Sequence, residues 1–443
     1  MSKARPEPDA SFQSLIAKLN WRLLPFLLVC YVFATLDRVN IGFAKLQMQG
    51  DLGLSDAAYG LGAGIFFIGY MMFEVPSNLM FPKWGARKTF SRILILWGLT
   101  SAGMMFVRDE TTFYVLRFML GVFEAGFAPG MFFYLTYWYG KANMGRVMGI
   151  VLLAGPLTGV ISGPLSGGIM THLAGVHGLH GWQWLFVLEG IPCVFLGVLA
   201  RFVLSDKPAD ARWLSAEERA LLASRKDADH PRHHSFAQVA RDPRIYLMAM
   251  VLFCLLNVAY AVAFWFPTLL RNSGVSDPLS IGCLSSIPAV VACVVMVMAG
   301  RISDRYGDRS RHVTISALIS AMGLAGATVF DGQLVPTLLF MTVAVSMMYA
   351  AYTVFWAMPS EYLKGDSAAG GIGLINTLAL ASGFVSPNII GLSTKLTGGT
   401  KAGMAVMVVL LIIGGCLGWL LRRPASRQDD ASSPLAAGTA DQA

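Results

Sequence analysis

Four ionisable side chains stand inside strongly apolar stretches of the sequence. Asp37 and Arg38 are neighbours in "YVFATLDRVNIGFAKL", and Arg117 and Glu124 belong to "LRFMLGVFEAGFAPG". A charge at the centre of a bilayer costs about 2.5–3.5 kcal/mol, so such residues face a wet cavity or an opposite charge and often mark an ion or substrate path. If these stretches cross a membrane, the four residues therefore indicate a site for a charged ligand.

Arg38 is the first candidate for binding that ligand. Adjacent positions on a helix point about 100° apart, so Arg38 and Asp37 need separate partners. A guanidinium stays protonated and holds a carboxylate through two parallel hydrogen bonds. We predict that Arg38 binds an anionic substrate; the alternative is an interhelical ion pair with a residue such as Glu124.

Glu124 is the first candidate for carrying a proton. It lies in an apolar, glycine-rich stretch, where loss of water favours the neutral form of a carboxyl group. Asp37 is the second candidate, because the neighbouring Arg38 favours its charged form. Arg117 shares a helix face with Glu124 two turns away, and we expect the two residues to act at different depths.

The whole chain has the composition of a membrane protein. Of its 443 residues, 55% are hydrophobic and 14% are charged, with a mean hydropathy of +0.58, whereas soluble domains carry about a quarter charged residues. Apolar runs of about 20 residues, enough to cross the hydrocarbon as a helix, occur twelve times. The sequence predicts an all-α membrane protein with twelve transmembrane helices, of which the fourth (112–137) and fifth (145–170) are broken by Gly and Pro.

Charge placement predicts the topology and the domains. Most of the 34 Lys and Arg residues fall in the tails and in every second connection, a distribution that marks the cytoplasmic side. We therefore attribute the net charge of +8 to topology and expect no nucleic-acid partner. The expected organisation is a cytoplasmic N-tail (1–20), a six-helix bundle (21–204), a charged linker with the helix-capping pattern "SAEE" (205–243), a second six-helix bundle (244–422) and a disordered cytoplasmic tail (423–443).

The two halves of the chain repeat one another. "NLMFPKWGARK" follows the second span and "GRISDRYGDRSR" follows the eighth, and the two align at Gly85 and Gly307. Each is a tight turn with basic residues at the helix ends, such as Arg87 in the first copy. A two-fold repeat of this kind is typical of transporters built as two parallel bundles around a central site.

The second copy of this turn resembles the signature loop of the major facilitator superfamily. Gly300, Asp304, Arg305, Gly307 and Arg309 stand where that pattern has them, whereas Pro82 occupies the Asp position in the first copy, so we expect the corresponding ion pair to be missing. Within the superfamily, "LDRVNIGFA", "FEVPSNL", "RFMLGVFEAGFAPG", "GWQWLFVLEGIP" and "ARWLSAEER" resemble the anion:cation symporter family. The resemblance runs from about residue 20 to residue 422.

This resemblance implies a fold, a ligand class and residue roles. The fold would be two pseudo-symmetric six-helix bundles, and the cargo an organic anion such as tartrate, phthalate, hydroxyphenylacetate or a sugar acid. It implies substrate contact by Arg38, proton coupling by Asp37 and Glu124, and a protonation-linked role for Arg117. The candidate gate residues are Gly85, Arg87, Asp304, Arg305, Gly307 and, near the cytoplasmic ends of the second and tenth spans, Glu74 and Glu361.

Three further residues could complete the anion site. Tyr70, Trp356 and Asn376 offer a hydroxyl, an indole N–H and an amide at positions that resemble those the family uses around its substrate, although each could equally serve packing. Thr353 is a weaker candidate. We interpret Glu189 as a structural partner in the cytoplasmic half of the sixth span.

The expected function is proton-coupled uptake of an organic carboxylate by alternating access across a bacterial inner membrane. Both termini would be cytoplasmic, the chain monomeric, and the proton gradient the energy source, with a small organic anion, protons and lipid as partners and no metal or cofactor. "GVISGPLSGG" (159–168) resembles a glycine pattern that the superfamily associates with antiporters, so exchange or export is the alternative, although helix packing also explains it. A membrane enzyme is disfavoured because the sequence has no HExxH, no GxSxG and no His–carboxylate cluster.

Overall fold

Helices make up most of the chain that the structure describes, a computed structural model covering residues 10–227, 240–363 and 367–422. Twelve segments, some of them broken, are long and apolar enough to cross a membrane, and no strand occurs within these ranges. The predicted all-α class with twelve spans is confirmed.

The first half contains α1 (Ala10–Leu52), α2 (Asp56–Trp84), α3 (Ala86–Gly103), α4 (Glu110–Glu124), α5 (Phe127–Thr136), α6 (Lys141–Leu152), α7 (Ala154–His172) and α8 (Gly181–Val203). After α9 (Ala216–Asp227), the second half contains α11 (Pro243–Asn272), α12 (Pro278–Tyr306), α13 (Arg309–Val329), α14 (Leu334–Phe355), α15 (Ala357–Tyr362), α16 (Ser367–Leu380), α17 (Ser382–Thr397) and α18 (Lys401–Leu420).

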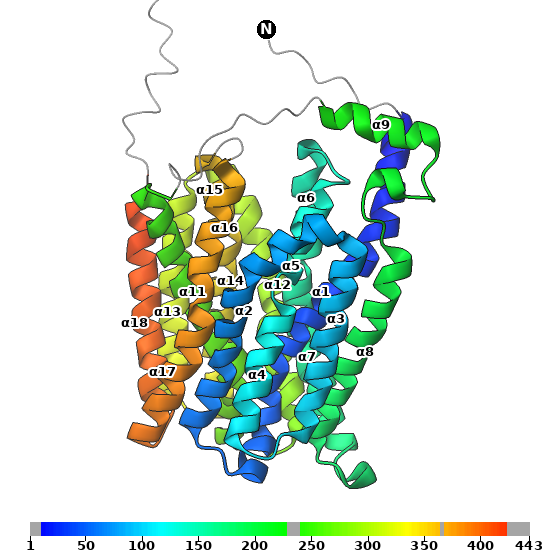
Figure 1. Cartoon of the computed structure of the whole chain (residues 1–443). Helices are drawn as coiled ribbons and strands as arrows, with labels where there is room; N and C mark the ends of the chain where they lie inside the picture. Colours follow the sequence, from blue (N-terminus) through cyan, green and yellow to red (C-terminus); the bar gives the residue numbers. More distant parts are fainter. Residues whose placement is uncertain (1–9, 228–239, 364–366, 423–443) are drawn as a thin grey trace, which may run out of the picture.

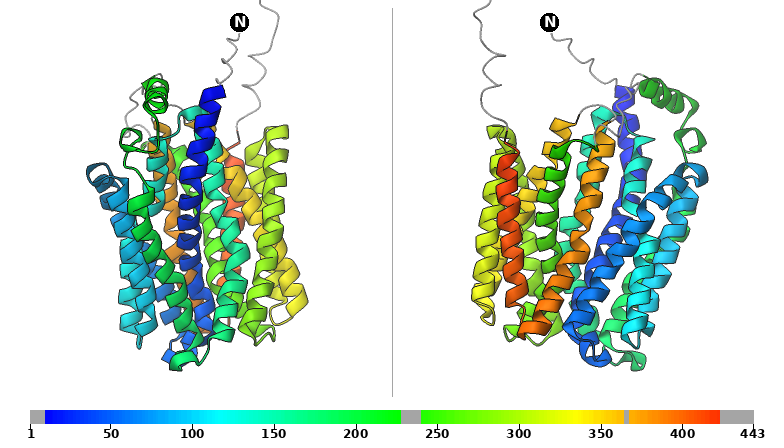
Figure 2. Two further views of the ribbon diagram at one scale, coloured as in Figure 1. Left: turned by 90° about the vertical axis from the view of Figure 1, so that its right-hand side faces the viewer. Right: turned by 60° about the vertical axis from the view of Figure 1, so that its left-hand side comes forward.

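The helices form two groups that meet along a central seam. Across this seam α7 packs against α12, and α2 packs against α17. The transmembrane helices run roughly parallel, and α9 lies across one end of the molecule near the start of α1 (Figure 1). Figure 2 shows the two groups side by side from further directions. We call the end that carries α9 the linker face, and the opposite end, with turns 53–55 and 273–277, the far face.

The first helix is longer than the sequence predicts. α1 begins at Ala10, inside the predicted 1–20 tail, and has 43 residues, or about 65 Å at 1.5 Å per residue. The additional N-terminal turns of α1 contact the linker, because Lys18 Nζ forms an ion pair with Glu218 of α9 at 2.8 Å. Ser215 and Glu218 cap the start of α9 reciprocally, at 2.8 and 3.1 Å, which confirms the capping pattern. Residues 1–9, part of the linker (228–239) and the predicted C-terminal tail (423–443) lie outside the described residues.

Several spans are interrupted. The fourth is broken between α4 and α5, where Gly126 has a positive φ of 87°, and the fifth is broken at Leu153, ahead of its Gly–Pro stretch. The tenth and eleventh are also divided, at Trp356 and Ala381, which the sequence does not predict. Breaks within membrane helices are found where backbone lines a cavity or packs inside protein.

The repeated turns occur as predicted. Gly85 ends α2 and Gly307 ends α12, with φ of 79° and 73°, a conformation that side chains with a Cβ rarely adopt. The missing Asp of the first copy is replaced from a distance, because Asp206 at the start of the linker accepts a hydrogen bond from the Arg87 backbone N–H at 2.9 Å. In the second copy Asp308 caps α13 locally, accepting from the Arg311 N–H at 3.1 Å.

The two halves touch closely toward the far face. A Cβ added to Gly163 on α7 would lie 2.2 Å from the carbonyl oxygen of Gly282 on α12, and one added to Gly60 would lie 2.4 Å from that of Pro387 on α17. Hydrogen bonds between the halves gather in the same region, such as Tyr59 Oη to the Phe264 carbonyl at 3.1 Å. The far face is therefore the closed end of the seam.

Candidate substrate and proton site

Arg38 and Glu124 meet inside the first half because α2 and α4 cross at glycines. A Cβ on Gly121 would lie 2.0 Å from the Phe66 carbonyl oxygen, and one on Gly69 would lie 2.4 Å from that of Phe118. No larger residue would allow the backbones to approach so closely. This crossing brings the end of α4 against the face of α2 that carries Phe66 and Tyr70.

Arg38 lies among aromatic rings of α2, and we use the word chamber for these surroundings of Arg38 and Glu124. One Nη atom donates to Glu124 Oε1, while its Nε has no partner among the described residues. The guanidinium carbon lies 5.3, 5.5 and 6.0 Å from the ring centres of Tyr70, Phe66 and Phe67. Its side chain keeps 18% exposure, against 1% for Glu124. The structure therefore contains the ion pair expected as the alternative, and it leaves the buried Nε of Arg38 without a partner among the described residues.

Glu124 is the last residue of α4, at the break before α5. Gly126 makes this break possible, since a Cβ there would meet Ser77 Oγ at 2.6 Å. The second carboxylate oxygen of Glu124 is buried and has no hydrogen-bond partner among the described residues. Its single described charged partner is Arg38, so removing Arg38 from Glu124 would leave a buried carboxylate uncompensated.

Asp37 points away from Arg38 into a separate polar cluster. It accepts hydrogen bonds from Trp97 Nε1 at 2.6 Å, from Ser101 Oγ, and from Asn40 Nδ2 at 3.1 Å. These donors lie on α3 and one turn along α1. Three hydrogen-bond donors stabilise the buried carboxylate of Asp37. The carboxylate of Glu124, in contrast, receives a single described hydrogen bond, from the Arg38 guanidinium.

Glu189 extends this buried cluster on α8. It accepts a hydrogen bond from Ser166 at 3.0 Å and is fully enclosed. α8 begins at Gly181 on the far-face side, so Glu189 lies nearer that end, and the predicted position in the linker-side half of the span is wrong. The span itself was predicted within one residue of α8 (Gly181–Val203), so the error lies in the depth assigned to Glu189 within it.

Arg117 is buried on α4 and contacts α2. Its Nε and one Nη donate to the carbonyl oxygens of Gly62 and Ala63 at 3.2 and 3.3 Å, and the guanidinium lies 5.1 Å from the Phe66 ring centre. It shares this ring with Arg38, which stands closer to Glu124. Among the described residues Arg117 forms no direct ion pair, so the expectation that it and Glu124 act at different depths agrees with this geometry.

The predicted substrate residues are only partly gathered around Arg38. Tyr70 lies directly over the guanidinium. Trp356 packs against Tyr352, with ring centres 6.0 Å apart, and its buried Nε1–H has no partner among the described residues. Thr353 uses its hydroxyl within the helix, donating to the Tyr349 carbonyl at 2.8 Å. Asn376 is half-buried on α16.

The candidate gate residues lie at the linker face or above the chamber. Arg87 donates to the Arg201 carbonyl at 2.7 Å through Nε, and Asp304 pairs with Arg309 at 3.4 Å; both contacts stay within one half. The Arg305 guanidinium lies 5.9 Å from the ring centre of Tyr306. Glu74 is buried one turn beyond Tyr70, with one oxygen unpartnered. Glu361 belongs to α15, and its side chain lies outside the described part of the chain.

Sequence reasoning missed most of the residues around these charges. Phe66 and Phe67 form the chamber wall on α2, and Tyr260 on α11 packs on Phe67 with ring centres 4.6 Å apart. Phe66, Tyr70 and Glu74 recur every fourth residue, so they share one face of a helix, and this spacing could have placed Phe66. Nothing in the sequence pairs Trp97 or Ser101 with Asp37.

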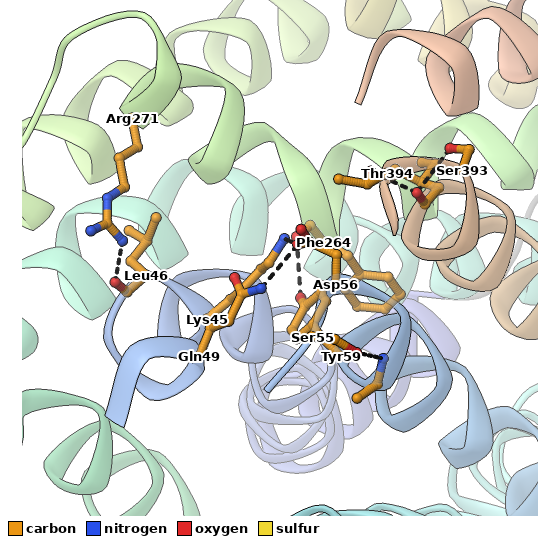
Figure 3. A network of polar contacts seen from close by, with 12 residues as sticks. Lys45, Leu46, Gln49, Ser55, Asp56, Tyr59, Phe264, Arg271, Ser393 and Thr394 are labelled. Carbon is orange, nitrogen blue, oxygen red and sulfur yellow. Dashed lines mark hydrogen bonds and ion pairs between the residues drawn. The ribbon is translucent and has the colours of Figure 1, made fainter. Parts of the chain in front are cut away.

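A second polar network closes the far face (Figure 3). The Lys45 side chain has 1% exposure; its Nζ pairs with Asp56 at 2.8 Å and lies 3.4 Å from the centre of the Trp265 ring. Arg271 of α11 donates to the Leu46 carbonyl. Beside this network lies a cavity of about 670 Å³, lined by residues such as Gln47, Asp51, His180 and Arg271. None of the predicted site residues lines that cavity.

Metal-binding geometry is not found in the described residues. No group of three or more His, Cys, Asp or Glu side chains there could hold an ion. The cysteines described are free. The chamber chemistry therefore consists of a guanidinium, carboxyl groups and aromatic rings.

Comparisons with known proteins match this architecture. The family model described as the Major Facilitator Superfamily matches residues 27–387 and 276–438. The metabolite transport protein NicT of Pseudomonas putida, so described by its name, is 45% identical over 409 residues. The match covers 91% of this chain and 94% of the relative. An Agrobacterium vitis protein named for tartrate transport is 39% identical, covering 92% and 91%. The Quinolone resistance transporter of Acinetobacter baumannii is 38% identical, covering 94% and 96%.

Solved structures show the same fold at low sequence identity. A bacterial homologue of the human lysosomal transporter Spinster, in an inward-facing and occupied conformation, superimposes with a TM-score of 0.75 at 16% identity, covering 90% of this chain and 96% of that one. A D-xylose–proton symporter gives 0.72 at 13% identity, covering 91% and 98%. The chain therefore belongs to the major facilitator superfamily and is a membrane transporter, not an enzyme.

Proposed function

We propose that this protein carries an organic carboxylate into the cell together with a proton. The observation that supports this most directly is the contact between Arg38 and Glu124. The Arg38 side chain keeps 18% exposure and its buried Nε has no partner among the described residues, whereas Glu124 is buried and depends on Arg38 for charge compensation. An incoming carboxylate and Glu124 would compete for the same guanidinium.

This competition couples the two ligands. A substrate carboxylate that takes the guanidinium leaves Glu124 as an unpaired buried anion, at a cost of several kcal/mol. A proton on Glu124 removes this cost, so proton and substrate bind together more tightly than either binds alone. When the proton leaves, Glu124 regains Arg38 and displaces the anion. Asp37, held by three donors, is our second proton-binding candidate.

Alternating access would carry the two ligands across the membrane. With the linker face in the cytoplasm, as the basic tails and connections favour, the closed far face corresponds to an inward-facing state. The breaks in α4–α5 and α14–α15 lie beside the chamber and would let the two halves rock around it. We assign the protein to a bacterial inner membrane, as a monomer with both termini in the cytoplasm.

Glu124→Gln tests the proton assignment in reconstituted vesicles. Gln is neutral like protonated Glu, so the variant should still exchange labelled anion across the membrane but should lose at least tenfold in accumulation driven by a proton gradient. The matched control is Glu110→Gln, at the exposed start of the same helix, which should behave like the unchanged protein. If Glu124→Gln accumulates anion with an unaltered dependence on the gradient, Glu124 is not the proton carrier.

Exchange or export is the second candidate function. A 38% identical relative is named for quinolone resistance, and quinolones bear a carboxylate. An obligate exchanger would take up labelled anion only into vesicles that already contain anion. The symporter would accumulate labelled anion in vesicles that contain none at the start. The glycines of 159–168 also serve helix packing, because Gly163 and Gly167 pack on the backbone of α12.

A further inference from the structure

We propose that the carboxylate bound at Arg38 carries a planar aromatic ring. This inference rests on the proposed function and narrows its substrate class, which the sequence left open between aliphatic hydroxy acids and aromatic acids. It is carried by what surrounds the guanidinium.

The wall next to Arg38 consists of rings. The guanidinium pairs with Glu124, and its carbon lies 5.3–6.0 Å from the ring centres of Phe66, Phe67 and Tyr70 of α2. The Tyr260 hydroxyl of α11 lies within electrostatic reach of Arg38. A ligand whose carboxylate replaces that of Glu124 must place its remaining atoms beside these rings.

The ring wall crosses the seam between the halves. Phe67 and Tyr260 meet nearly edge to face, with centres 4.6 Å apart, and Tyr260 stacks on Phe264 at 5.9 Å. On α14 a second series runs from Tyr349 to Tyr352 to Trp356, at 6.4 and 6.0 Å. Both halves therefore contribute rings to this region, and we expect an aromatic ligand to contact both.

Three polar side chains near this wall already use their hydrogen-bond donors. Thr35 donates to the Tyr31 carbonyl at 3.0 Å, Thr353 donates to the Tyr349 carbonyl at 2.8 Å, and Asn257 Nδ2 donates to the Phe253 carbonyl at 2.8 Å. These donors are used within their own helices. A polyhydroxy acid would have to replace the water lost from several hydroxyl groups with the tyrosine hydroxyls and the Trp356 Nε1–H of the wall, and each unreplaced hydrogen bond costs free energy. An aromatic ring needs no such replacement.

Two matched ligands separate ring chemistry from charge. Benzoate and cyclohexanecarboxylate have the same carbon skeleton size and one carboxylate each, but only benzoate has a planar π system. Edge-to-face and stacked contacts add enough affinity to favour benzoate by about tenfold. Binding to the purified protein would be measured by titration calorimetry, with tartrate as a hydroxy diacid probe. We expect the order benzoate, cyclohexanecarboxylate, tartrate.

Ring-removing variants then locate the effect. Tyr260→Leu should reduce benzoate affinity about tenfold while changing cyclohexanecarboxylate much less, and Tyr260→Phe, which keeps the ring, should lose less than Tyr260→Leu. The control is Phe330→Leu, which removes one ring of the stacked Phe330–Phe340 pair on α13 and α14 outside the chamber. It should leave the ligand preference unaltered.

The possible results separate this inference from the proposed function. Equal binding of benzoate and cyclohexanecarboxylate, or tighter binding of tartrate, would overturn the aromatic inference and leave carboxylate transport intact. A complete absence of carboxylate binding would overturn both. The ligand comparison uses the unaltered protein, so it decides the matter even if the Tyr260 variants do not fold.

Discussion

At the residue scale, the charges in this membrane interior are divided between a switchable contact and fixed ones. Arg38 and Glu124 share one described hydrogen bond and each keeps an unpartnered atom. Asp37 accepts several hydrogen bonds from side chains of α1 and α3, and Arg117 donates two to backbone carbonyl oxygens of α2. Separating Arg38 from Glu124 breaks fewer hydrogen bonds than freeing Asp37 or Arg117 would, so it costs less free energy. We therefore expect the substrate to bind at Arg38.

Arg38→Lys should weaken anion binding by about 10- to 100-fold. Lysine keeps the charge but loses the planar fork that binds a carboxylate bidentately, and a hydrogen bond to a charged group contributes about 1.5–3 kcal/mol. The measurement is the ligand-induced rise in unfolding temperature of the purified protein. Arg92→Lys is the control, since Arg92 packs on Trp84, with its guanidinium carbon 4.9 Å from the ring centre, away from the chamber. An unchanged ligand response in Arg38→Lys would exclude bidentate binding at this position.

At the scale of elements, glycine contacts decide how the halves meet. Gly163 and Gly282 face each other across α7 and α12, and a Cβ on either would lie 2.1–2.2 Å from the carbonyl oxygen of the other. A methyl group there forces the backbones apart. Such contacts exist only while the far face is closed, so they report on the transport cycle as well as on stability.

Gly163→Ala should therefore shift the protein toward the state that is open at the far face. Overpacking costs about 1–3 kcal/mol, which corresponds to a population shift of roughly 5- to 150-fold. The shift can be measured as faster labelling of a cysteine placed at the seam on the far side. Gly168→Ala is the control on the same helix, because its Cβ would lie 3.9 Å from Leu279. Equal labelling of the two variants would show that this contact does not set the gate.

Sequence predicted elements better than contacts, for a physical reason. The number of spans follows from the length of the hydrophobic runs. The two turns follow from the glycines at 85 and 307, which can adopt the positive φ that the turns require. Both are local properties of the sequence. The partners of Asp37 come from α3, about 60 residues away in sequence, and their identity depends on how helices pack. Asp206 replaces the missing Asp of the first turn from the linker for the same reason. A pairing that depends on tertiary packing leaves no local pattern to recognise.

At the scale of the whole molecule, closure of the far face depends on a few contacts between halves. Lys45 and Asp56 belong to the first half, but Lys45 also lies against Trp265 of the second. Tyr59 bonds the Phe264 carbonyl, and Arg271 bonds the Leu46 carbonyl. Together these contacts hold the outer ends of α1, α2 and α11 against one another (Figure 3). Their release has to accompany opening toward this side.

Asp56→Asn should loosen this closure by leaving the Lys45 ammonium without a carboxylate. Removing one partner of a buried pair costs about 3–5 kcal/mol, and the 30% exposure of Asp56 reduces that cost. Spin labels at Gly50→Cys and Ser276→Cys, both exposed on opposite halves of the far face, should gain a longer-distance population in the variant. Lys18→Met is the control, because its exposed pair with Glu218 lies at the linker face and within one half. If Asp56→Asn leaves the distance distribution unaltered, the Lys45–Asp56 pair stabilises α1 and α2 locally and takes no part in gating. The closed state must then depend on the other contacts between the halves, such as those of Tyr59, Arg271 and the glycines of α7 and α12.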